Sequence, residues 1–355
     1  MARPADKLRA VVEVIRARIA HGSDALRGMP GERQLAIELG VSRQTVRSAI
    51  GQLEREGCLA RLPNGRIGAA AGREGSARRP EIGFVRRAEG SQENAFWLNG
   101  ITRAVDGRAT VREVSFDHFG DPALAAALEA FDGIFLHPSR ESASPWLGER
   151  LRSSRCRVAI LDFDWTAYGL PSISVFPARA EWKLLEHLRD LGHRRVDCVN
   201  AQPLDPVIEA RIAAWREGLA EFGLTGRLHS DPGYPAVEMA YRLMRRKLKA
   251  RERSPLGTAL LCVTGPAAVG TLRACADEGI AVGRDLSVVA MNDEGLGPYL
   301  TPSLTCLQSP PRENFLLSAV EWMIGRKEWQ GSLWVEPKDI PMFVGESSGA
   351  ALRSF

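Results

Sequence analysis

The chain has 355 residues, enough for two or three domains, and its 45% apolar and 25% charged residues are ordinary for a globular protein. The formal net charge is +4, and no apolar run reaches the ~20 residues that a membrane-spanning helix needs. The N-terminus lacks the apolar stretch of a signal peptide, so we expect a cytoplasmic protein that does not contact membranes.

Two helices joined by a tight turn are predicted near the N-terminus, after a first helix at about residues 5–20. Leu35 and Leu39 share one helical face, and Gly40 can adopt the left-handed conformation that ends such a helix. Ser42 is a favourable N-cap for the next helix. That helix carries apolar residues at i, i+3, i+4 and i+7, namely Val46, Ala49, Ile50 and Leu53. The pattern is typical of a helix-turn-helix.

The polar face of the second helix carries side chains that can read DNA bases. Arg43, Gln44 and Arg47 lie toward its N-terminal end, where helix-turn-helix proteins make their base contacts. An arginine can bond both acceptors of guanine, and a glutamine can bond both polar groups of adenine. The alternative is a pair of surface helices whose arginines are only solvated.

A basic hairpin is predicted next, and it favours DNA binding. Asn64-Gly65 is a strong two-residue turn signal, and Arg61 and Arg66 flank it. Residues 1–80 contain 15 Lys and Arg against 8 Asp and Glu, a net charge of +7, which leaves −3 for the rest of the chain. A basic module on a slightly acidic body is the charge pattern of nucleic-acid binding.

The rest of the chain reads as a linker followed by an α/β body. Residues 70–80 are small, polar and basic and end in proline, as linkers often are. Buried apolar strands separated by helices then indicate doubly wound parallel sheets, with enough chain for two lobes. Ligands of this fold class bind at the carboxyl ends of strands. The expected strands lie at about 82–85, 133–136, 158–162, 196–199, 259–263 and 286–291, and the helices at about 95–106, 178–191, 207–222, 266–278 and 311–324.

The N-terminal part resembles the winged helix-turn-helix of GntR-type bacterial transcription regulators. The resemblance rests on PGERQLA at 30–36, LGVSRQTVR at 39–47 and LEREG at 53–57. It implies a DNA-binding domain over residues 1–69. Because Ile67-Gly68-Ala69-Ala70 stands where Gly-Thr-Phe-Val is more usual, we expect a weak second wing strand. The implied DNA contacts are Arg33, Ser42, Arg43, Gln44, Thr45 and Arg47, with Asn64, Gly65 and Arg66 at the wing tip.

The body resembles the effector-binding half of LacI-type repressors, which is related to periplasmic sugar-binding proteins. The resemblance implies an effector-binding and dimerisation domain over 81–348, with one lobe at about 81–174 and 309–333 and the other at about 175–308 and 334–348. The segments that carry it are LEHL at 185–188, LGHRR at 191–195, RIAAW at 211–215, EGIAVGRDLSVV at 278–289 and PSLTCLQ at 302–308.

By position in that family, an effector cleft between the lobes is expected. Arginine paired with an acid or amide can bond neighbouring sugar hydroxyls, and an aromatic ring can lie against the sugar's apolar face. A single arginine or tryptophan in such a lobe is more often a surface ion pair or core filler, which is the alternative for each position. The expected lining residues are Arg87, His137, Asp162, Phe176, Arg211, Trp215, Thr264, Gly265, Asn292, Asp293 and Gln308.

The sequence departs from the family pattern at two places in this cleft. Thr264-Gly265-Pro266 stands where Asn-Asp is common, and Val175-Phe176-Pro177 where Val-Asp-Asn is common. Two acidic, hydroxyl-binding positions are thus missing. The departures suggest a ligand that is more apolar or more anionic than a plain aldose, such as a sugar acid or phosphate. The competing hypothesis is that effector sensing has decayed.

Together these features predict a DNA-binding transcription regulator, a homodimeric repressor with a near-palindromic operator and a sugar or sugar derivative as effector. An enzyme is not expected, since the sequence has no P-loop, no GxGxxG after a strand, no HExxH and no GxSxG, and its body is too short for an aminotransferase fusion. A secreted solute-binding protein is disfavoured by the basic head. The six cysteines, at 58, 156, 198, 262, 275 and 306, are scattered without metal-site spacing, so no metal and no cofactor are expected.

Overall fold

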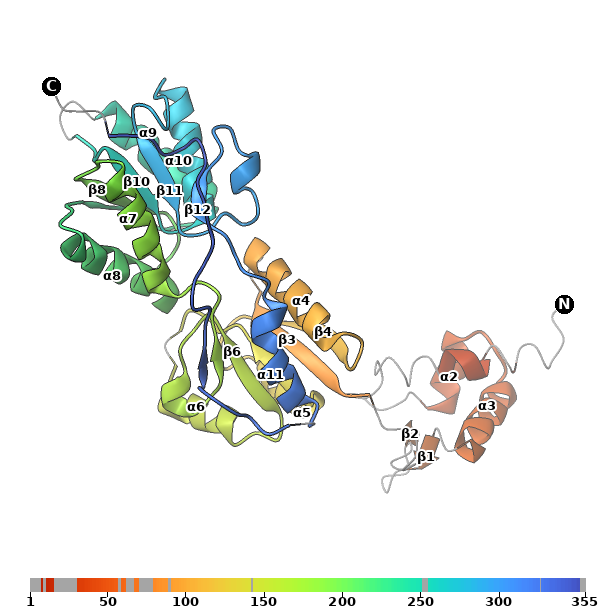
Figure 1. Ribbon diagram of the computed structural model, residues 1–355. Coiled ribbons are helices and arrows are strands. Elements are labelled where there is room, and N and C mark those ends of the chain that lie inside the picture. Colours follow the sequence, from red (N-terminus) through yellow and green to blue (C-terminus); the bar gives the residue numbers. More distant parts are fainter. Residues whose placement is uncertain are drawn as a thin grey trace. The chain divides into compact units, whose positions relative to one another are not determined.

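The computed structural model divides into two compact units, Met1–Arg78 and Arg79–Phe355, which we describe separately (Figure 1). The structure describes residues 8, 11–15, 31–56, 59–61, 67–69, 79–88, 91–141, 143–250, 255–325 and 327–351. The predicted wing tip at Asn64, Gly65 and Arg66 lies outside these ranges, as does the predicted helix end at Gly57.

The first unit contains the expected helix-turn-helix. Helix α2 (Glu32–Glu38) is followed by Gly40, whose φ of +60° is the left-handed conformation predicted from the sequence. Helix α3 (Arg43–Arg55) begins after Ser42, whose hydroxyl accepts a hydrogen bond from the backbone N–H of Thr45 at 3.1 Å. The buried core of the unit consists of Val11, Val12, Ile15, Leu35, Val46, Ala49, Ile50, Leu53 and Leu59.

A short antiparallel ladder completes this unit. Strand β1 (Leu59–Arg61) pairs with β2 (Ile67–Ala69), with Leu59 opposite Ala69 and Arg61 opposite Ile67. The second wing strand therefore forms over the atypical Ile67-Gly68-Ala69 sequence, although only three residues pair on each side. The winged helix-turn-helix prediction is confirmed.

The second unit has two lobes, each built on a six-stranded sheet, as predicted. In lobe 1 the strand order is β13-β7-β6-β5-β3-β4, and every neighbouring pair is parallel. The strands are β3 (Glu81–Arg87), β4 (Thr110–Phe116), β5 (Gly133–Leu136), β6 (Arg157–Leu161), β7 (Ser172–Ile173) and β13 (Trp334–Val335).

Helices cover both faces of this sheet because successive strand residues point to opposite sides. Ile82 and Phe84 of β3 face the core that α4 (Gln92–Val105) and α11 (Glu313–Met323) share, and these two helices lie side by side in Figure 1. Val85 faces the core under α5 (Pro122–Ala130) and α6 (Pro145–Arg152).

Lobe 2 repeats this plan with strand order β14-β12-β11-β10-β8-β9, in which only β14, at the edge, runs antiparallel to its neighbour. Its strands are β8 (Val196–Asn200), β9 (Leu228–Ser230), β10 (Ala259–Cys262), β11 (Ser287–Ala290), β12 (Thr305–Leu307) and β14 (Met342–Phe343). Its helices are α7 (Trp182–Asp190) and α8 (Pro206–Glu221) on one face, and α9 (Ala236–Lys249) and α10 (Gly265–Asp277) on the other. Three short 3₁₀ turns are η1 (Thr166–Tyr168), η2 (Ala178–Glu181) and η3 (Gly297–Tyr299).

Three chain segments connect the lobes: one after β7, one between β12 and α11, and one between β13 and β14. The last connection differs from the sequence prediction, which placed residues from 334 onward in lobe 2. Trp334 and Val335 instead pair in parallel with Ser172 and Ile173, so the chain crosses only beyond Val335. The crossing was misplaced because a two-residue edge strand carries no readable periodicity.

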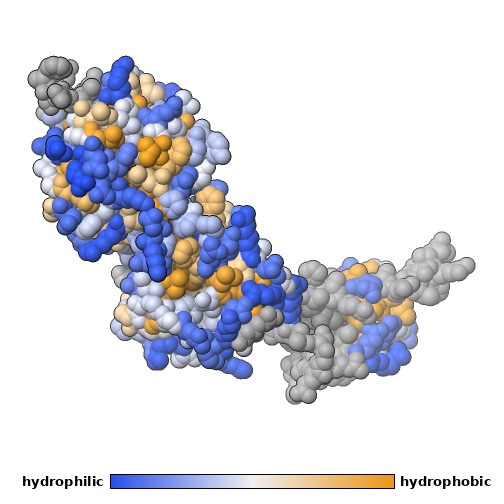
Figure 2. All heavy atoms as spheres, in the orientation of Figure 1, coloured by the Kyte–Doolittle hydropathy of each residue, from blue (hydrophilic) through white to orange (hydrophobic). Residues whose placement is uncertain are grey.

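The surface of the described residues mixes polar and apolar side chains, as Figure 2 shows for one face. Within the ranges that the structure covers, no helix is long and apolar enough to cross a membrane.

Candidate functional site

The exposed face of α3 presents the side chains predicted to contact DNA. Arg43 and Arg47 are largely exposed, at 63% and 57% of their side-chain surface. Gln44 and, on α2, Arg33 are also exposed. Thr45 lies at the start of the helix, with its hydroxyl 2.8 Å from that of Ser42. The helix end therefore offers donors of the kind that meet phosphates and base edges.

Glu32, which the sequence analysis did not single out, ties two of these side chains together. Its carboxylate accepts hydrogen bonds from Arg47 Nη2 at 3.0 Å and from Arg43 Nε at 3.3 Å. The hydrogen bonds from Arg47, with further help from Arg43, hold the pKa of Glu32 below its ordinary value despite partial burial. One acid on α2 thus orients two arginines on α3. The sequence feature that could have indicated this role is the acid directly before Arg33, at the start of α2.

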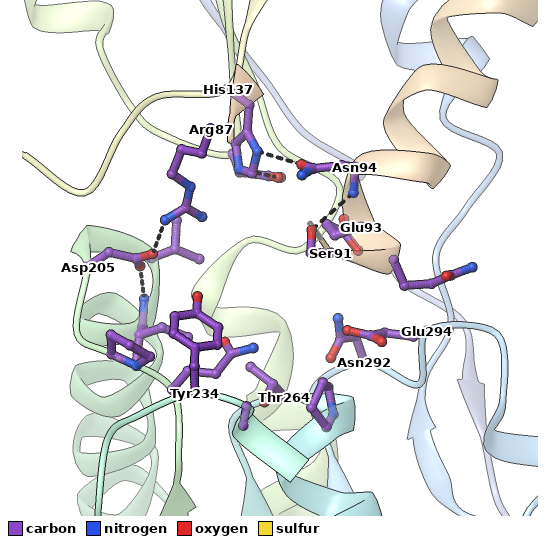
Figure 3. Close-up of a pocket in the computed structure, with 18 of the residues that line it drawn as sticks. Arg87, Ser91, Glu93, Asn94, His137, Asp205, Tyr234, Thr264, Asn292 and Glu294 are labelled. Carbon is purple, nitrogen blue, oxygen red and sulfur yellow. Dashed lines mark hydrogen bonds and ion pairs between the residues drawn. The ribbon is translucent and has the colours of Figure 1, made fainter. Parts of the chain in front are cut away.

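A second site lies in the cleft between the lobes of the second unit. A pocket of about 300 Å³ opens where the carboxyl ends of the two sheets face each other. In lobe 1, Arg87 ends one strand, and His137 and Asp162 follow two others. In lobe 2, Thr264 and Asn292 follow two strands, and Figure 3 shows both near Arg87 and His137 at the pocket. This is the position at which two-lobed α/β proteins bind ligands.

Two contacts join the lobes across this pocket. Arg87 of lobe 1 forms an ion pair with Asp205, the N-cap of α8 in lobe 2, at 3.4 Å (Figure 3). Arg140 of lobe 1 donates a hydrogen bond to the hydroxyl of Tyr234 and lies over its ring, 4.9 Å from the centroid. Both contacts hold the two walls together at the level where a ligand would enter.

His137 is held as a neutral imidazole on the lobe 1 wall. Burial, with the charges of Arg87, Arg312 and Arg86, lowers its pKa to about 3. Its Nδ1 lies 3.1 Å from Asn94 Oδ1, and its Nε2 lies 3.6 Å from Asp162 Oδ2. With Nδ1–H donating to the amide oxygen, Nε2 is left as an acceptor beside the Asp162 carboxyl.

Asp162 and Glu294 stand on opposite walls of the pocket, and both hold their protons unusually well. Burial, reinforced by the charge of Glu93, raises the pKa of Asp162 to about 7. Burial and repulsion from Glu93 and Asp293 raise the pKa of Glu294 to about 7 as well. Both residues have positive φ, +63° and +49°, a conformation that non-glycine residues adopt rarely and mostly at functional sites.

Arg211 reaches the pocket from α8 and is almost completely buried. Its Nη1 donates to the carbonyl oxygen of Val263 at 2.8 Å, whereas its Nε has no hydrogen-bond partner among the described residues. The charge of Arg211 also acts on Glu181, a fully buried acid on η2 whose carboxyl oxygens both lack partners in the structure as described. Burial raises the pKa of Glu181 well above its ordinary value, which favours its protonated form.

The predicted cleft residues fall into three groups. Six residues of the predicted set line the pocket: Arg87, His137, Asp162, Arg211, Thr264 and Asn292. Three others, Phe176, Asp293 and Gln308, line a neighbouring pocket of about 490 Å³ that shares Glu93, Asn292 and Glu294 with the first. Gly265 lines neither pocket, but its backbone N–H fixes the Asn292 side chain through a 2.7 Å hydrogen bond.

Trp215 requires a correction. It is buried in the core of lobe 2, where its indole N–H donates to the carbonyl oxygen of Val196 at 3.2 Å, and it lines neither pocket. It lies four residues after Arg211 on α8, close to the helix face that meets the sheet. The alternative of core filler holds at this position.

Several pocket residues were missed by the sequence analysis. Glu93 and Asn94 come from the first turn of α4, Asp205 from the cap of α8, Tyr234 from a loop, and Glu294 from the loop after β11. Ser91 and Asp205 were readable as N-caps, which places the polar residues beside them at helix ends near the sheet edge. The loop residues carried no comparable signal.

Comparison with known proteins agrees with this architecture. Residues 7–68 match the family model of bacterial regulatory proteins of the gntR family, and residues 185–324 match that of the periplasmic binding protein-like domain. Curated relatives include the transcriptional repressor PurR of Vibrio cholerae, 26% identical over 36% of this chain and 37% of its own length. Catabolite control protein A of Priestia megaterium is 25% identical over 46% of this chain and 48% of its own. The chain thus spans less than half the length of these curated relatives.

Solved structures extend the similarity to about three quarters of the chain. A lac repressor dimer bound to operator and the anti-inducer ONPF superimposes with a TM-score of 0.63 at 18% identity, over 78% of this chain and 96% of the other. A LacI family regulator from Arthrobacter sp. FB24 in complex with lactose gives 0.63 at 17% identity, over 76% and 100%. At these identities the likeness establishes the fold. The chain therefore joins a part that matches the gntR regulatory-protein model to a part that matches the periplasmic binding protein-like domain model and has the fold of LacI family regulators, the domain composition of a bacterial DNA-binding transcription regulator.

Proposed function

We propose that the protein is a homodimeric repressor whose affinity for a near-palindromic operator is controlled by a small carbohydrate bound between the lobes. The observation that carries this proposal is the pocket of about 300 Å³ at the carboxyl ends of both sheets, lined by polar side chains from both lobes. A ligand that touches both walls changes the free energy of lobe closure, which is how binding there can alter the DNA-binding state.

The lining suits a hydroxyl-rich ligand. Asn292, Gln202 and Ser91 offer donors and acceptors, and the rings of Tyr234 and Phe163 offer apolar faces. Solved LacI family regulators that share this fold are described in complex with lactose and with bound ribose, which supports a carbohydrate for this chain.

The charges favour a ligand that is not an anion. Four carboxyl groups line the pocket against two guanidinium groups, and one of these, on Arg87, is already paired with Asp205. The sequence-based hypothesis of a sugar acid or phosphate, drawn from the loss of acids at Phe176 and Gly265, therefore receives no support from the pocket. Glu93, Asp205 and Glu294 replace the missing acids from other positions.

Dimerisation and repression are proposed from the domain types. Helix-turn-helix proteins bind two half-sites through a two-fold dimer, and one solved relative of the second unit is described as a repressor dimer bound to operator. Sedimentation of the purified protein at low micromolar concentration tests the first point. A monomer that still binds a palindromic site with full affinity would contradict it.

The regulatory proposal is tested by operator binding with and without sugars. Selection from random duplexes identifies the operator, and fluorescence anisotropy then measures its affinity in the presence of neutral pentoses, neutral hexoses and their acidic derivatives. We expect at least one neutral sugar or neutral-sugar derivative to change the affinity and to raise the melting temperature of the second unit. A complete absence of thermal shift with every member would favour a decayed effector site.

The DNA-binding surface has its own test. Arg43→Ala should cost about 1–3 kcal/mol in operator binding and relax specificity at one base pair, if this side chain reads a guanine. The matched control is Arg55→Ala, at the last residue of α3, where the side chain only bonds the carbonyl oxygen of Gly51. Equal effects of the two substitutions would contradict the docking of the N-terminal end of α3 into the groove.

A further inference from the structure

The charged groups of the inter-lobe pocket are not balanced. Arg87 pairs with Asp205 across the lobes, and Arg312 donates to Glu93 at 2.6 Å. Once these two pairs are formed, the groups that remain at the pocket are one guanidinium, on Arg211, and two carboxyl groups, on Asp162 and Glu294.

Asp162 forms no ion pair with a charged arginine or lysine among the described residues. Its Oδ2 accepts a 2.7 Å hydrogen bond from the indole N–H of Trp97, and the neutral imidazole of His137 lies 3.6 Å away. Its side chain is 13% exposed, so little water compensates for the absence of a cation. The charges of Arg312 and Arg211 act to lower the pKa of Asp162, but burial and the charge of Glu93 outweigh them. The carboxyl group therefore faces the pocket without a direct ion-pair partner among the described cations.

Glu294, on the opposite wall of the pocket, also lacks a cation partner among the described residues. No hydrogen bond or ion pair links its carboxyl to any residue that the structure describes, and its charged neighbours Glu93 and Asp293 are both acids. Figure 3 shows the Glu294 side chain beside Asn292 at the edge of the pocket. The positive φ of Glu294 means that the backbone is held in an unfavourable conformation while the side chain takes this position.

Arg211, the remaining guanidinium group at the pocket, needs a hydrogen-bond acceptor. The residue is more than nine-tenths buried and lines the pocket, and its Nε lacks a hydrogen-bond partner. A buried donor without a partner is costly, so the site lacks an acceptor at this point as well as a cation at the two carboxyl groups.

We propose that the effector is a polyhydroxylated molecule carrying a protonated amine, which lies between Asp162 of lobe 1 and Glu294 of lobe 2 while one of its oxygens accepts from Arg211. This inference rests on the proposed carbohydrate-sensing function and narrows its ligand class. An ammonium group between carboxyl groups of both lobes removes the charge imbalance and holds the two walls together. A sugar with only hydroxyl groups supplies the acceptor for Arg211 but leaves both carboxyl groups without a cation.

Proton release gives the amine a distinct signature. Because burial and neighbouring acids raise the pKa of both carboxyl groups to about 7, each is partly protonated at neutral pH in the empty pocket. A bound ammonium group stabilises the ionised forms, so binding releases protons and tightens as the pH rises toward 7. A neutral sugar has no such linkage at these groups.

The test uses matched sugars that differ at one position. Isothermal titration of the full-length protein compares D-glucosamine with D-glucose and N-acetyl-D-glucosamine, and D-galactosamine with D-galactose and N-acetyl-D-galactosamine, in two buffers of unlike ionisation enthalpy. In at least one series the amine should bind at least about tenfold more tightly than both neutral members, because a charged hydrogen bond replaces a neutral one. The titrations in the two buffers should differ by the enthalpy of the released protons.

Two variants separate the amine contact from general effects. Glu294→Gln keeps the size of the side chain and should reduce both the preference for the amine and the number of protons released, because only Asp162 then remains to pair with the ammonium group. Glu217→Gln, at an exposed acid on α8 that pairs with Arg179, should leave both unchanged. Tighter or equal binding of the neutral sugars in wild-type protein overturns this inference and leaves the carbohydrate function standing. No binding of any member overturns both.

Discussion

At the scale of single residues, Glu32 decides how the recognition helix presents its arginines. One carboxylate, 16% exposed, holds Arg43 and Arg47 through hydrogen bonds of 3.0–3.3 Å while both guanidinium groups remain open to solvent. Holding long side chains in one orientation reduces the entropy that they lose on binding. If α3 docks on DNA as proposed, Glu32 also brings a negative charge toward the DNA backbone, which would weaken contacts that do not depend on sequence.

We predict that Glu32→Gln lowers the discrimination between operator and random DNA. Loss of the ion pairs frees both arginines, and loss of the negative charge strengthens binding to any duplex, so the ratio of the two affinities should fall by about tenfold. Anisotropy titrations with operator and scrambled duplexes at one salt concentration measure it. Glu38→Gln, on the same helix, is the matched control because its carboxylate accepts from Gln34 and not from α3. An unchanged ratio in the Glu32 variant means that this acid has only a structural role.

Asp162 gives a prediction about stability and pH. Its pKa of about 7 lies well above the ordinary 3.8, so the folded state keeps this proton when the unfolded chain has lost it. The contribution of Asp162 to the free energy of unfolding therefore declines as the pH rises from about 4 to 7. Asparagine does not titrate, can accept from Trp97, and tolerates positive φ.

Asp162→Asn should accordingly be close to wild type in stability near pH 4 and more stable by on the order of 1–4 kcal/mol at about pH 8. Denaturant unfolding at both pH values, in the absence of sugars, measures the two free energies. His137 stays neutral in both proteins over this range, since burial lowers its pKa to about 3, so it does not obscure the comparison. A stability difference that is the same at both pH values would rule out a titrating Asp162.

At the scale of elements, the pattern of apolar residues predicted the buried strands, but it predicted fewer of the elements at the edges of the sheets and on their outer faces. Strands β5, β6, β8, β10 and β11 are buried along almost their whole length, and their continuous apolar runs are readable in the sequence. Strand β4 was missed because it lies at a sheet edge with alternating partial exposure. Helix α9 was missed although its buried residues Ala240, Leu243, Met244 and Leu248 do follow helical spacing.

Helices α9 and α10 pack closely against each other, and this packing depends on Gly270. A Cβ atom at this position would lie 2.3 Å from the carbonyl oxygen of Val237 and 2.8 Å from the Cβ of Ala240. Since backbone cannot yield as a flexible side chain does, Gly270→Ala should destabilise the second unit by about 1–3 kcal/mol. Thermal and denaturant unfolding of the full chain measure the loss.

The control is a glycine with free space around it. Gly51 lies inside α3, and a Cβ there would have no atom within 4 Å. Gly51→Ala should therefore stabilise the first unit by roughly 0.5–1 kcal/mol through helix propensity alone. If Gly270→Ala proves equally harmless, α9 and α10 are not packed as closely as the structure has them.

At the scale of the whole molecule, the sequence predicted which residues meet in the inter-lobe pocket better than it predicted the charge of that pocket. Arg87, His137, Asp162, Thr264 and Asn292 lie at strand ends, which parallel sheets bring together, so their convergence followed from the fold class. The charge of the site could not be predicted in the same way. It depends on Glu93, Asp205 and Glu294, which come from helix starts and loops whose approach is decided by lobe-to-lobe packing.

The coupling between DNA and effector yields the final prediction, which needs no knowledge of how the two units are arranged. If a sugar lowers operator affinity by some factor, operator must lower affinity for that sugar by the same factor, because both routes connect the same four states. The effect of operator on sugar affinity is measured by titrating the sugar into free protein and into protein saturated with operator. The effect of the sugar on operator affinity is measured separately, by anisotropy titrations of operator in saturating sugar and in its absence. For a typical regulator each should be about 5–150-fold, and a co-repressor would reverse the sign of both.

Arg211→Lys, which removes the Nε–H, should weaken sugar binding in both titrations while the operator affinity of sugar-free protein stays unchanged. Identical sugar affinity in the presence and absence of operator would show that the pocket does not control the DNA-binding domain.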